Sequence, residues 1–307
     1  MLNSHALADN HPQVRLAALL LMADLPAGPD AGPALHAALT TAANSTDPVL
    51  RDALTAAVVR HEAAFGRAVL QEKAVLPPGA GEVVRRLAHH IAAGAPEYGP
   101  GVVGQLGEVP TGTAEAILAE MAAGWPDGQR PKFDAAVLGP IGQRLSPVAQ
   151  ADFLGLAQKW GALAEFPELV TQVIRTTLST VGQADAPAAA RVSAARSLLR
   201  LADSEANVAT VLRHITPTSP PELATGPLES LGSSRAPGTG ATLLAAWKNF
   251  TPLARRTAIA PIAPPTRVVE RLAGCRGPGR VAPHGSRPPA VAATRPKPAS
   301  GAVGAGS

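Results

Sequence analysis

Apolar residues recur at helical spacing along most of the chain. In the stretch "HPQVRLAALLLMADL", Val14, Ala18, Leu21 and Leu25 fall on one face of a helix with about 3.6 residues per turn. His11, which precedes Pro12, is a weak N-cap. The pattern predicts a helix whose apolar face packs against a neighbour.

The stretch "DPVLRDALTAAVVRH" repeats this design. Leu50, Leu54 and Val58 share a face, and Asp47 is a favourable N-cap. Pro48 stands at the first helical position, where its missing N–H costs nothing. We expect Leu54 to be buried and Asp47 to begin the helix.

The two stretches share the pattern Pro-x-x-Arg. Pro12 and Pro48 are 36 positions apart, and Arg15 and Arg51 follow them at the same offset. The planar guanidinium of such an arginine reaches a carboxylate or a helix-end carbonyl of an adjacent unit. We therefore expect Arg51 and Asp47 to contribute to contacts between stacked units.

Weaker copies follow. "GEVVRRLAHHIAAG" places Arg85 34 residues after Arg51, and further echoes begin at Asp185 and Thr251. Units of two helices and about 34 to 47 residues are typical of an α-solenoid, in which neighbouring units complete each other's core. The predicted fold is a right-handed α-solenoid of degenerate helical pairs.

The whole chain favours an all-α fold. Hydrophobic residues make up 46% of its 307 residues and aromatic residues only 3%, and β-branched residues rarely alternate with polar ones. The predicted helices span 12–25, 32–43, 48–60, 62–75, 80–93, 113–124, 131–145, 147–163, 166–181, 186–202, 205–215, 236–249 and 252–260.

Two resemblances follow from these motifs. "HPQVRLAALLL" and "DPVLRDALTAAVV" resemble HEAT repeats. "EAILAEMAAGWPDGQRPKFDAAVLGPIGQRL" and "FLGLAQKWGA" resemble the helical region of bacterial putative membrane-bound dehydrogenases. In that family a β-propeller domain comes before the HEAT region and a haem-binding c-type cytochrome domain with a CxxCH motif comes after it. The likeness covers residues 10–260.

The chain departs from that family where its chemistry lies. No propeller precedes the first repeat, and Cys275 stands in "CRGPG", so no CxxCH motif is present. The resemblance implies a non-catalytic HEAT-repeat scaffold, a fragment of the multidomain protein, whose partners are a protein or the missing propeller and cytochrome domains. The alternative is a free-standing interaction module unrelated to redox chemistry.

The two ends of the chain differ in composition. We assign residues 1–262 to the helical solenoid and residues 263–307 to a disordered tail rich in Pro, Ala, Gly and Arg. The tail is either the product of a frameshift or a basic linker. Residues 273–307 hold five cations and no acid and contribute +5, so with a net charge of +4 for the whole chain residues 1–272 carry −1. Such a near-neutral body is a poor nucleic-acid binder.

Localisation stays open. The N-terminus has no basic start or apolar segment typical of a secretory signal, and no apolar run is long enough to span a membrane. The chain is either cytoplasmic or lacks its true beginning. The family resemblance implies an extracytoplasmic protein.

Motifs for chemistry are weak. "HEAAF" (His61 to Phe65) begins like a zinc-protease helix but has Phe65 at the place of the second histidine, so we expect a solvated helix start. "GPGVVG" (99–104) matches GxGxxG without the strand that a dinucleotide site requires, so we expect a glycine-rich connection.

His89 and His90 are adjacent and point to different sides of a helix, so a shared metal is not expected; one should pack and the other face solvent. Trp125 and Trp160 are either packing residues, which we favour, or binding anchors. We find no nucleophile elbow, triad or carboxylate pair. We therefore expect no catalytic, cofactor-binding or metal-binding residues, no cofactor and no enzymatic activity.

Overall fold

The computed structural model describes residues 4–262, with side chains from residue 5 to residue 259. Every element in this part of the chain is helical, and it contains no strand. The all-α prediction is therefore confirmed for the described residues. The predicted tail, 263–307, lies outside them.

The helices follow one another with short connections. The α-helices are α1 (Pro12–Asp24), α2 (Ala31–Thr40), α3 (Ala42–Thr46), α4 (Pro48–Arg60), α5 (Glu62–Gln71), α6 (Ala80–Gly94), α7 (Gly99–Val103), α8 (Thr111–Gly124), α9 (Ala135–Arg144), α10 (Pro147–Lys159), α11 (Pro167–Gly182), α12 (Ala188–Leu201), α13 (Glu205–Arg213), α14 (Pro221–Ser230), α15 (Thr239–Ala246) and α16 (Pro252–Ile262). The 3-10 helices are η1 (Ser4–Ala8), η2 (Pro96–Tyr98), η3 (Leu106–Glu108), η4 (Leu163–Glu165), η5 (Leu231–Ser233) and η6 (Trp247–Asn249).

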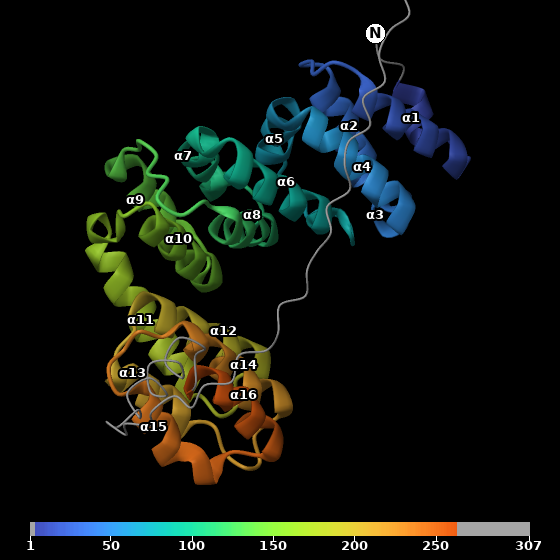
Figure 1. Cartoon of the computed structure of the whole chain (residues 1–307). Helices are drawn as coiled ribbons and strands as arrows, with labels where there is room; N and C mark the ends of the chain where they lie inside the picture. The colour runs from blue at the N-terminus through green and yellow to red at the C-terminus, as the bar shows by residue number, and fades with distance from the viewer. Residues whose placement is uncertain (1–3, 263–307) are drawn as a thin grey trace, which may run out of the picture. The chain divides into compact units, whose positions relative to one another are not determined.

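One set of helices forms a continuous row (Figure 1). Helix α1 contacts α4, α4 contacts α6, and α6 contacts α8; the row continues through α10, α12, α14 and α16. Other helices pack beside it: α2 contacts α5, α11 contacts α12, and α13 contacts α15. Each helix of the row thus buries its apolar residues against the helices before and after it.

Helix α4 forms as its sequence predicts. The Asp47 carboxylate accepts hydrogen bonds from the backbone N–H groups of Val49 and Leu50, at 2.8 and 3.1 Å, which satisfies donors that the first turn leaves free. Leu50, Leu54 and Val58 are buried. Both the cap and the predicted face are confirmed.

Helix α1 presents a different face from the predicted one. Val14 and Leu21 are 41% and 59% exposed, whereas Arg15, Leu19 and Met22 are buried. The prediction failed because apolar residues occur on all sides of this helix, so their spacing alone does not fix which side faces the row. An arginine marks the buried side.

Arg15 explains how that side tolerates a charge. Its Nε donates to Asn44 Oδ1 at 2.7 Å, and its Nη1 donates to the carbonyl oxygens of Asp9 and Asn10 at 2.7 and 3.2 Å. A buried guanidinium needs such partners, since desolvation without them is costly. Arg15 thus reaches a neighbouring element, α3, but through a side-chain amide and not through the carboxylate or helix-end carbonyl that we expected there.

No hydrogen bond of the kind expected for Arg51 is found in the part of the chain that the structure describes. Its Nε is buried and has no hydrogen-bond partner among the described residues, and Asp47 is used in its own cap. The ion pair between α4 and α6 is made one position later, where Arg86 Nη1 lies 2.7 Å from Asp52 Oδ1. The exposed side of α4, rather than the Pro-x-x-Arg position, carries the contact between charged residues.

Buried apolar side chains fall into two separate clusters. The first runs from Leu7 to Val173 and includes Leu201. The second begins at Val181 and continues from Ala194 to Ala258. The boundary between the two cores lies at α10, α11 and α12.

Three α-helices were not predicted as separate elements: α3, α7 and α14. The predicted helix 32–43 runs past the end of α2 and stops inside the short α3. Helix α7 forms within "GPGVVG", the glycine-rich connection that we expected, and it lies between α6 and α8 along the chain. Helix α14 lies in the row and was missed because prolines and glycine punctuate it; Pro221 begins the helix, and Pro227 lies inside it.

Candidate functional site

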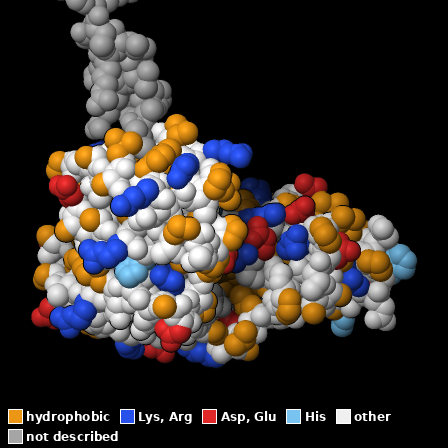
Figure 2. Space-filling model, turned by 90° about the horizontal axis from the view of Figure 1, so that it is seen from below, with side chains coloured by type: hydrophobic (Ala, Val, Ile, Leu, Met, Phe, Trp, Pro, Cys, Tyr) orange, Lys and Arg blue, Asp and Glu red, His pale blue; other side chains and the backbone are white. Residues whose placement is uncertain are grey.

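Charged side chains are widely distributed on the surface. On the face that Figure 2 draws, Lys and Arg side chains lie dispersed among apolar and neutral ones. Salt bridges such as Arg86 with Asp52 and Arg196 with Glu229 neutralise part of this charge. A candidate binding surface is therefore a groove that basic side chains line.

Such a place lies over α12. The sequence "SAARSLLR" puts Ser193, Arg196, Ser197 and Arg200 three or four positions apart, so they share one side of the helix. The apolar residues of the same stretch, such as Leu198, are buried on the other side. The helix thus packs by one face and offers a polar stripe on the other.

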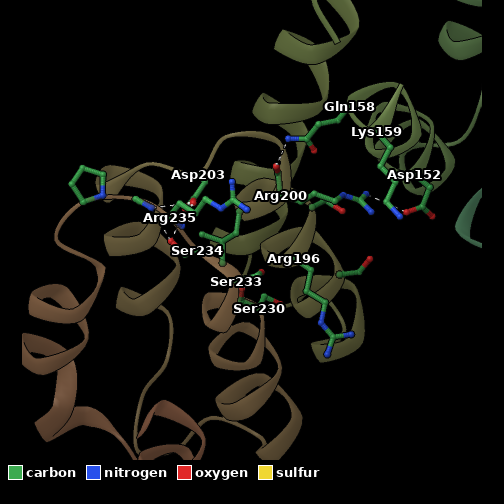
Figure 3. Close-up of a pocket in the computed structure, with 15 residues that line it drawn as sticks. Asp152, Gln158, Lys159, Arg196, Arg200, Asp203, Ser230, Ser233, Ser234 and Arg235 are labelled. Atoms are coloured by element: carbon green, nitrogen blue, oxygen red, sulfur yellow. Dashed lines mark hydrogen bonds and ion pairs between the residues drawn. The ribbon is translucent and has the colours of Figure 1, made fainter. Parts of the chain in front are cut away.

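This stripe is the floor of a groove of about 980 Å³. One wall comes from α10, and the other comes from the end of α14, η5 and the segment after it (Figure 3). The lining residues are mostly basic or hydroxylated: Asp152, Gln158, Lys159, Ser193, Arg196, Ser197, Leu199, Arg200, Asp203, Ser230, Ser233, Ser234, Arg235, Ala236 and Pro237.

Arg200 joins α12 to α10. Its Nη2 donates to the carbonyl oxygen of Ala151 at 2.7 Å and lies 3.2 Å from Asp152 Oδ1. The guanidinium lies directly over Gly155, where a Cβ atom would be 2.6 Å from Arg200 Cζ. Only glycine permits this close approach, so the ion pair depends on the sequence of both helices.

Burial changes the acidity of Asp152. Loss of solvent around the carboxyl raises its pKa above the ordinary value, and the nearby Arg200 guanidinium opposes that rise. Because its partner is an arginine rather than a nucleophile, the geometry assigns this carboxyl to positioning Arg200.

Asp203 shapes the opposite wall. Its Oδ2 accepts from the backbone N–H groups of Arg235 and Ala236 at 2.6 and 3.1 Å, and its Oδ1 accepts from Ser234 Oγ at 2.7 Å. These three bonds hold the segment after η5 beside α12. The side chain of Arg235 is thereby placed at the groove.

Two further lining residues stabilise helix ends. Lys159 Nζ donates to the carbonyl oxygen of Ala123, in the last turn of α8, at 3.3 Å. It also donates to the carbonyl oxygen of Trp125, the residue that follows α8, at 3.0 Å. Gln158 Nε2 donates to the carbonyl oxygen of Arg200 at 3.2 Å. Terminal carbonyls of helices lack intrahelical donors, so these contacts are structural.

The lining of the groove is rich in basic side chains. Its lining contains no histidine and no cysteine, and its contact between a serine and a carboxylate, Ser234 Oγ to Asp203 Oδ1, belongs to the set of bonds that holds the segment after η5. The guanidinium and ammonium donors of its basic side chains suit carboxylate or phosphate oxygens. The groove can hold an anionic group by charge-assisted hydrogen bonds.

The histidines singled out in the sequence lie elsewhere. His61 is buried between α4 and α5, where its Nε2 lies 2.9 Å from the carbonyl oxygen of Met22 and its Nδ1 accepts from Gly28 N–H. The prediction of a solvated helix start is wrong, because this ring bridges to the segment that ends α1. Phe65 is buried as well.

His89 and His90 were also mispredicted. Their side chains are 52% and 48% exposed, so neither packs in the core. His89 Nδ1 faces Glu120 on α8, and His90 Nε2 faces Glu62 on α5, both at 3.4 Å. The two rings serve different neighbours of α6. Among residues 4–262, no three His, Cys, Asp or Glu side chains form a group suited to a metal ion.

Both tryptophans pack, which confirms the favoured interpretation. Trp125 and Trp160 are buried with ring centroids 5.3 Å apart in an edge-on arrangement, a preferred geometry for aromatic pairs. Trp125 Nε1 donates to the carbonyl oxygen of Gln129 at 3.0 Å.

The argument that the chain lacks a haem-attachment motif rests on Cys275, which lies outside the described residues.

Sequence reasoning did not find the groove. The signal for its floor was present in the alternation of polar and apolar residues along α12. Its second wall depends on α14 and η5, which the sequence pattern did not predict.

The described part of the chain therefore belongs to the all-helical class of proteins, and none of its helices is long and apolar enough to cross a membrane. No protein-family model matches the sequence, and no curated protein matches it.

Proposed function

We propose that this chain is a non-catalytic scaffold that binds a partner protein. In this proposal the row of helices is a right-handed α-solenoid of degenerate HEAT-like pairs, and the groove over α12 is the place where a partner docks. The observation that carries the proposal is the uninterrupted row from α1 to α16 with a polar groove on it. Rows of this kind offer long, rigid binding surfaces.

The repeated Pro-x-x-Arg stretches support the HEAT-like assignment. Pro12 and Pro48 begin α1 and α4, and Pro252 begins α16, with an arginine three residues later in each case. All three helices belong to the row. The recurrence of the pattern at the start of three helices of the row supports the resemblance.

The partner takes one of two forms. The resemblance of residues 10–260 to membrane-bound dehydrogenases implies propeller and cytochrome domains, which the scaffold would hold in position. The alternative is a free-standing module with an unrelated partner. The nucleotide sequence around the gene separates the two: coding sequence for a propeller and a CxxCH motif nearby supports the first, and an isolated gene supports the second.

The scaffold proposal is tested by quantitative affinity purification of the full chain from the cells that encode it, after mild crosslinking. Three forms are compared: the unchanged chain, Arg196→Gln/Arg235→Gln in the groove, and Arg67→Gln/Arg175→Gln. The last pair removes the same charge at exposed positions of α5 and α11, outside the groove lining.

We expect one identified protein to co-purify with the unchanged chain and the control, and to bind the purified chain in calorimetry. A chain that purifies alone in all three forms contradicts the scaffold. A partner retained equally by all three leaves the scaffold intact and removes the groove from it.

A further inference from the structure

The groove is more basic than its surroundings require. Lys159, Arg196, Arg200 and Arg235 line it against only two acids, Asp152 and Asp203, an excess of two positive charges. The net charge of residues 1–272 is, by contrast, only −1. A local excess of one charge in a hollow favours a ligand of the opposite charge.

The two acids do not cancel this excess for a ligand. Asp203 already accepts three hydrogen bonds from the segment after η5. Asp152 is mostly buried and is paired with Arg200. Both carboxylates are used inside the protein, so the charged groups that the groove presents to a ligand are mainly cations.

Two of the four cations are available to a ligand. Lys159 and Arg200 donate to backbone carbonyl oxygens. Arg196 makes a single contact of 3.3 Å with Glu229, and both side chains are more than half exposed; such surface pairs exchange easily for another carboxylate. No hydrogen bond or ion pair is found for the Arg235 guanidinium within the described residues, and the residue is exposed.

The shape indicates an extended ligand. Figure 3 shows Ser234, Ser233 and Ser230 between Arg235 and Arg196 in the view that it draws. Each of these hydroxyls donates its one O–H inside the protein, to Asp203, Ser230 and Gly226 respectively. Their oxygen lone pairs can still accept from the backbone N–H groups of an extended ligand. A volume of about 980 Å³ exceeds what one carboxylate fills, so a run of several residues fits better than a single anion.

The lining also discriminates between anionic polymers. It contains no aromatic side chain on which a base could stack, and basic residues on the face drawn in Figure 2 are dispersed rather than continuous. A nucleic acid needs a tract of cations along its backbone. A short acidic peptide needs only the few donors that the groove offers.

We propose that the groove over α12 binds an extended acidic segment of the partner protein, with Arg196 and Arg235 as the principal carboxylate-binding residues. This inference rests on the proposed function, because it names the chemistry of the partner at the same site. Arg200 and Asp203 are positioning residues that hold the two walls.

The test is fluorescence anisotropy with the full chain and a short labelled peptide of alternating glutamate and serine. A peptide with glutamine in place of glutamate, and a labelled single-stranded oligothymidine, are the comparison probes. The proteins are the unchanged chain, Arg196→Gln/Arg235→Gln and the charge-matched control Arg67→Gln/Arg175→Gln, each checked for helix content by circular dichroism.

We expect the glutamate peptide to bind the unchanged chain and the control alike, and the groove variant at least about tenfold more weakly, since two charge-assisted hydrogen bonds are lost. The basic residues between 276 and 297 are present in all three proteins, so binding by them would leave the three alike and overturn the proposal. Equal binding of the glutamine peptide, or preferential binding of oligothymidine, would overturn it as well.

The two proposals fail separately. Loss of peptide binding with an intact partner complex removes the acidic-segment inference and leaves the scaffold. A chain without any partner removes the scaffold itself.

Discussion

Leu54 shows how one residue ties the sequence pattern to the packing. It lies in the middle of the apolar face of α4 and is fully buried, where α4 contacts α1 and α6. Val49, on the same helix, is 60% exposed. The pair separates the effect of burial from that of helix propensity.

We expect Leu54→Ala to lower the free energy of unfolding by ~2–5 kcal/mol, because it removes buried methyl groups and leaves a cavity. Val49→Ala should change it by less than ~0.5 kcal/mol. Urea unfolding followed by circular dichroism measures both. An effect of Leu54→Ala as small as that of Val49→Ala would show that the face of α4 is misassigned.

The raised pKa of Asp152 has a defined consequence for stability. In the folded state this carboxyl binds its proton more tightly than in the unfolded chain, because burial disfavours the charged form. As the pH rises from the unfolded-state pKa to the higher folded-state pKa, the unfolded chain ionises first, so stability is lost over that interval. Asp152 lowers stability once it is ionised, and this effect disappears in acid.

We expect the urea midpoint of the unchanged chain to fall relative to that of Asp152→Asn as the pH rises from acid to neutral. The variant keeps the shape of the side chain and cannot ionise. Parallel midpoints over that range, or a difference that runs the other way, would contradict the assigned environment of Asp152.

At the level of the helices, α2 and α5 approach more closely than side chains normally allow. A Cβ atom added to Gly32 on α2 would overlap the carbonyl oxygen of Ala64 on α5. Gly66, also on α5, has nothing within 4 Å of such an atom. Substitution of Gly32 therefore tests how closely α2 and α5 pack, and substitution of Gly66 is its control.

Gly32→Ala should destabilise the protein by about 1–3 kcal/mol, the usual cost of overpacking. Gly66→Ala should stabilise it by about 0.5–1 kcal/mol, since alanine is the better residue inside a helix. Thermal or urea unfolding of both variants provides the measurement. Two stabilising substitutions would mean that α2 and α5 do not pack this closely.

Helix positions were predictable because most boundaries carry local signals. Asp47 and Pro48 begin α4 where the pattern predicts, and Pro147 begins α10. Helix α14 was missed because Pro227 normally interrupts a helix, and here tertiary packing overrides that preference. Gly226, beside it, fits against Val192 of α12, a contact between segments distant in the sequence.

The buried face of α1 and the presence of the groove could not be predicted from the sequence. Apolar residues occur on every side of α1, so their spacing does not show which side is buried. The side that carries Arg15 is buried, where Arg15 contacts Asn44. The polar stripe with Arg196 and Arg200 was readable on α12. The wall with Arg235 was not, since Asp203 fixes it through hydrogen bonds that no sequence spacing encodes.

At the scale of the described chain, two separate cores share one row of helices. The first cluster reaches Val173 and Leu201, and the second starts at Val181. In proteins built by stacking, each part is stabilised mainly by its neighbours, so parts with separate cores can open separately.

Hydrogen exchange measured by mass spectrometry at increasing urea should therefore show two transitions. Peptides from α4, α6 and α8 should report one, and peptides from α13, α14 and α15 should report the other. A single transition shared by all of these helices would mean that the two clusters act as one cooperative core.

The central claim is that this protein binds a partner at the groove over α12, and site-specific photo-crosslinking tests it most directly. A photoreactive amino acid is placed at position 235 in one form of the full chain and at position 67 in another, and each is irradiated in the cells that encode the protein. We predict that position 235 crosslinks to one protein through an acidic segment, identified by mass spectrometry, and that position 67 does not. The same crosslinks from both positions, or none from position 235, would contradict the claim.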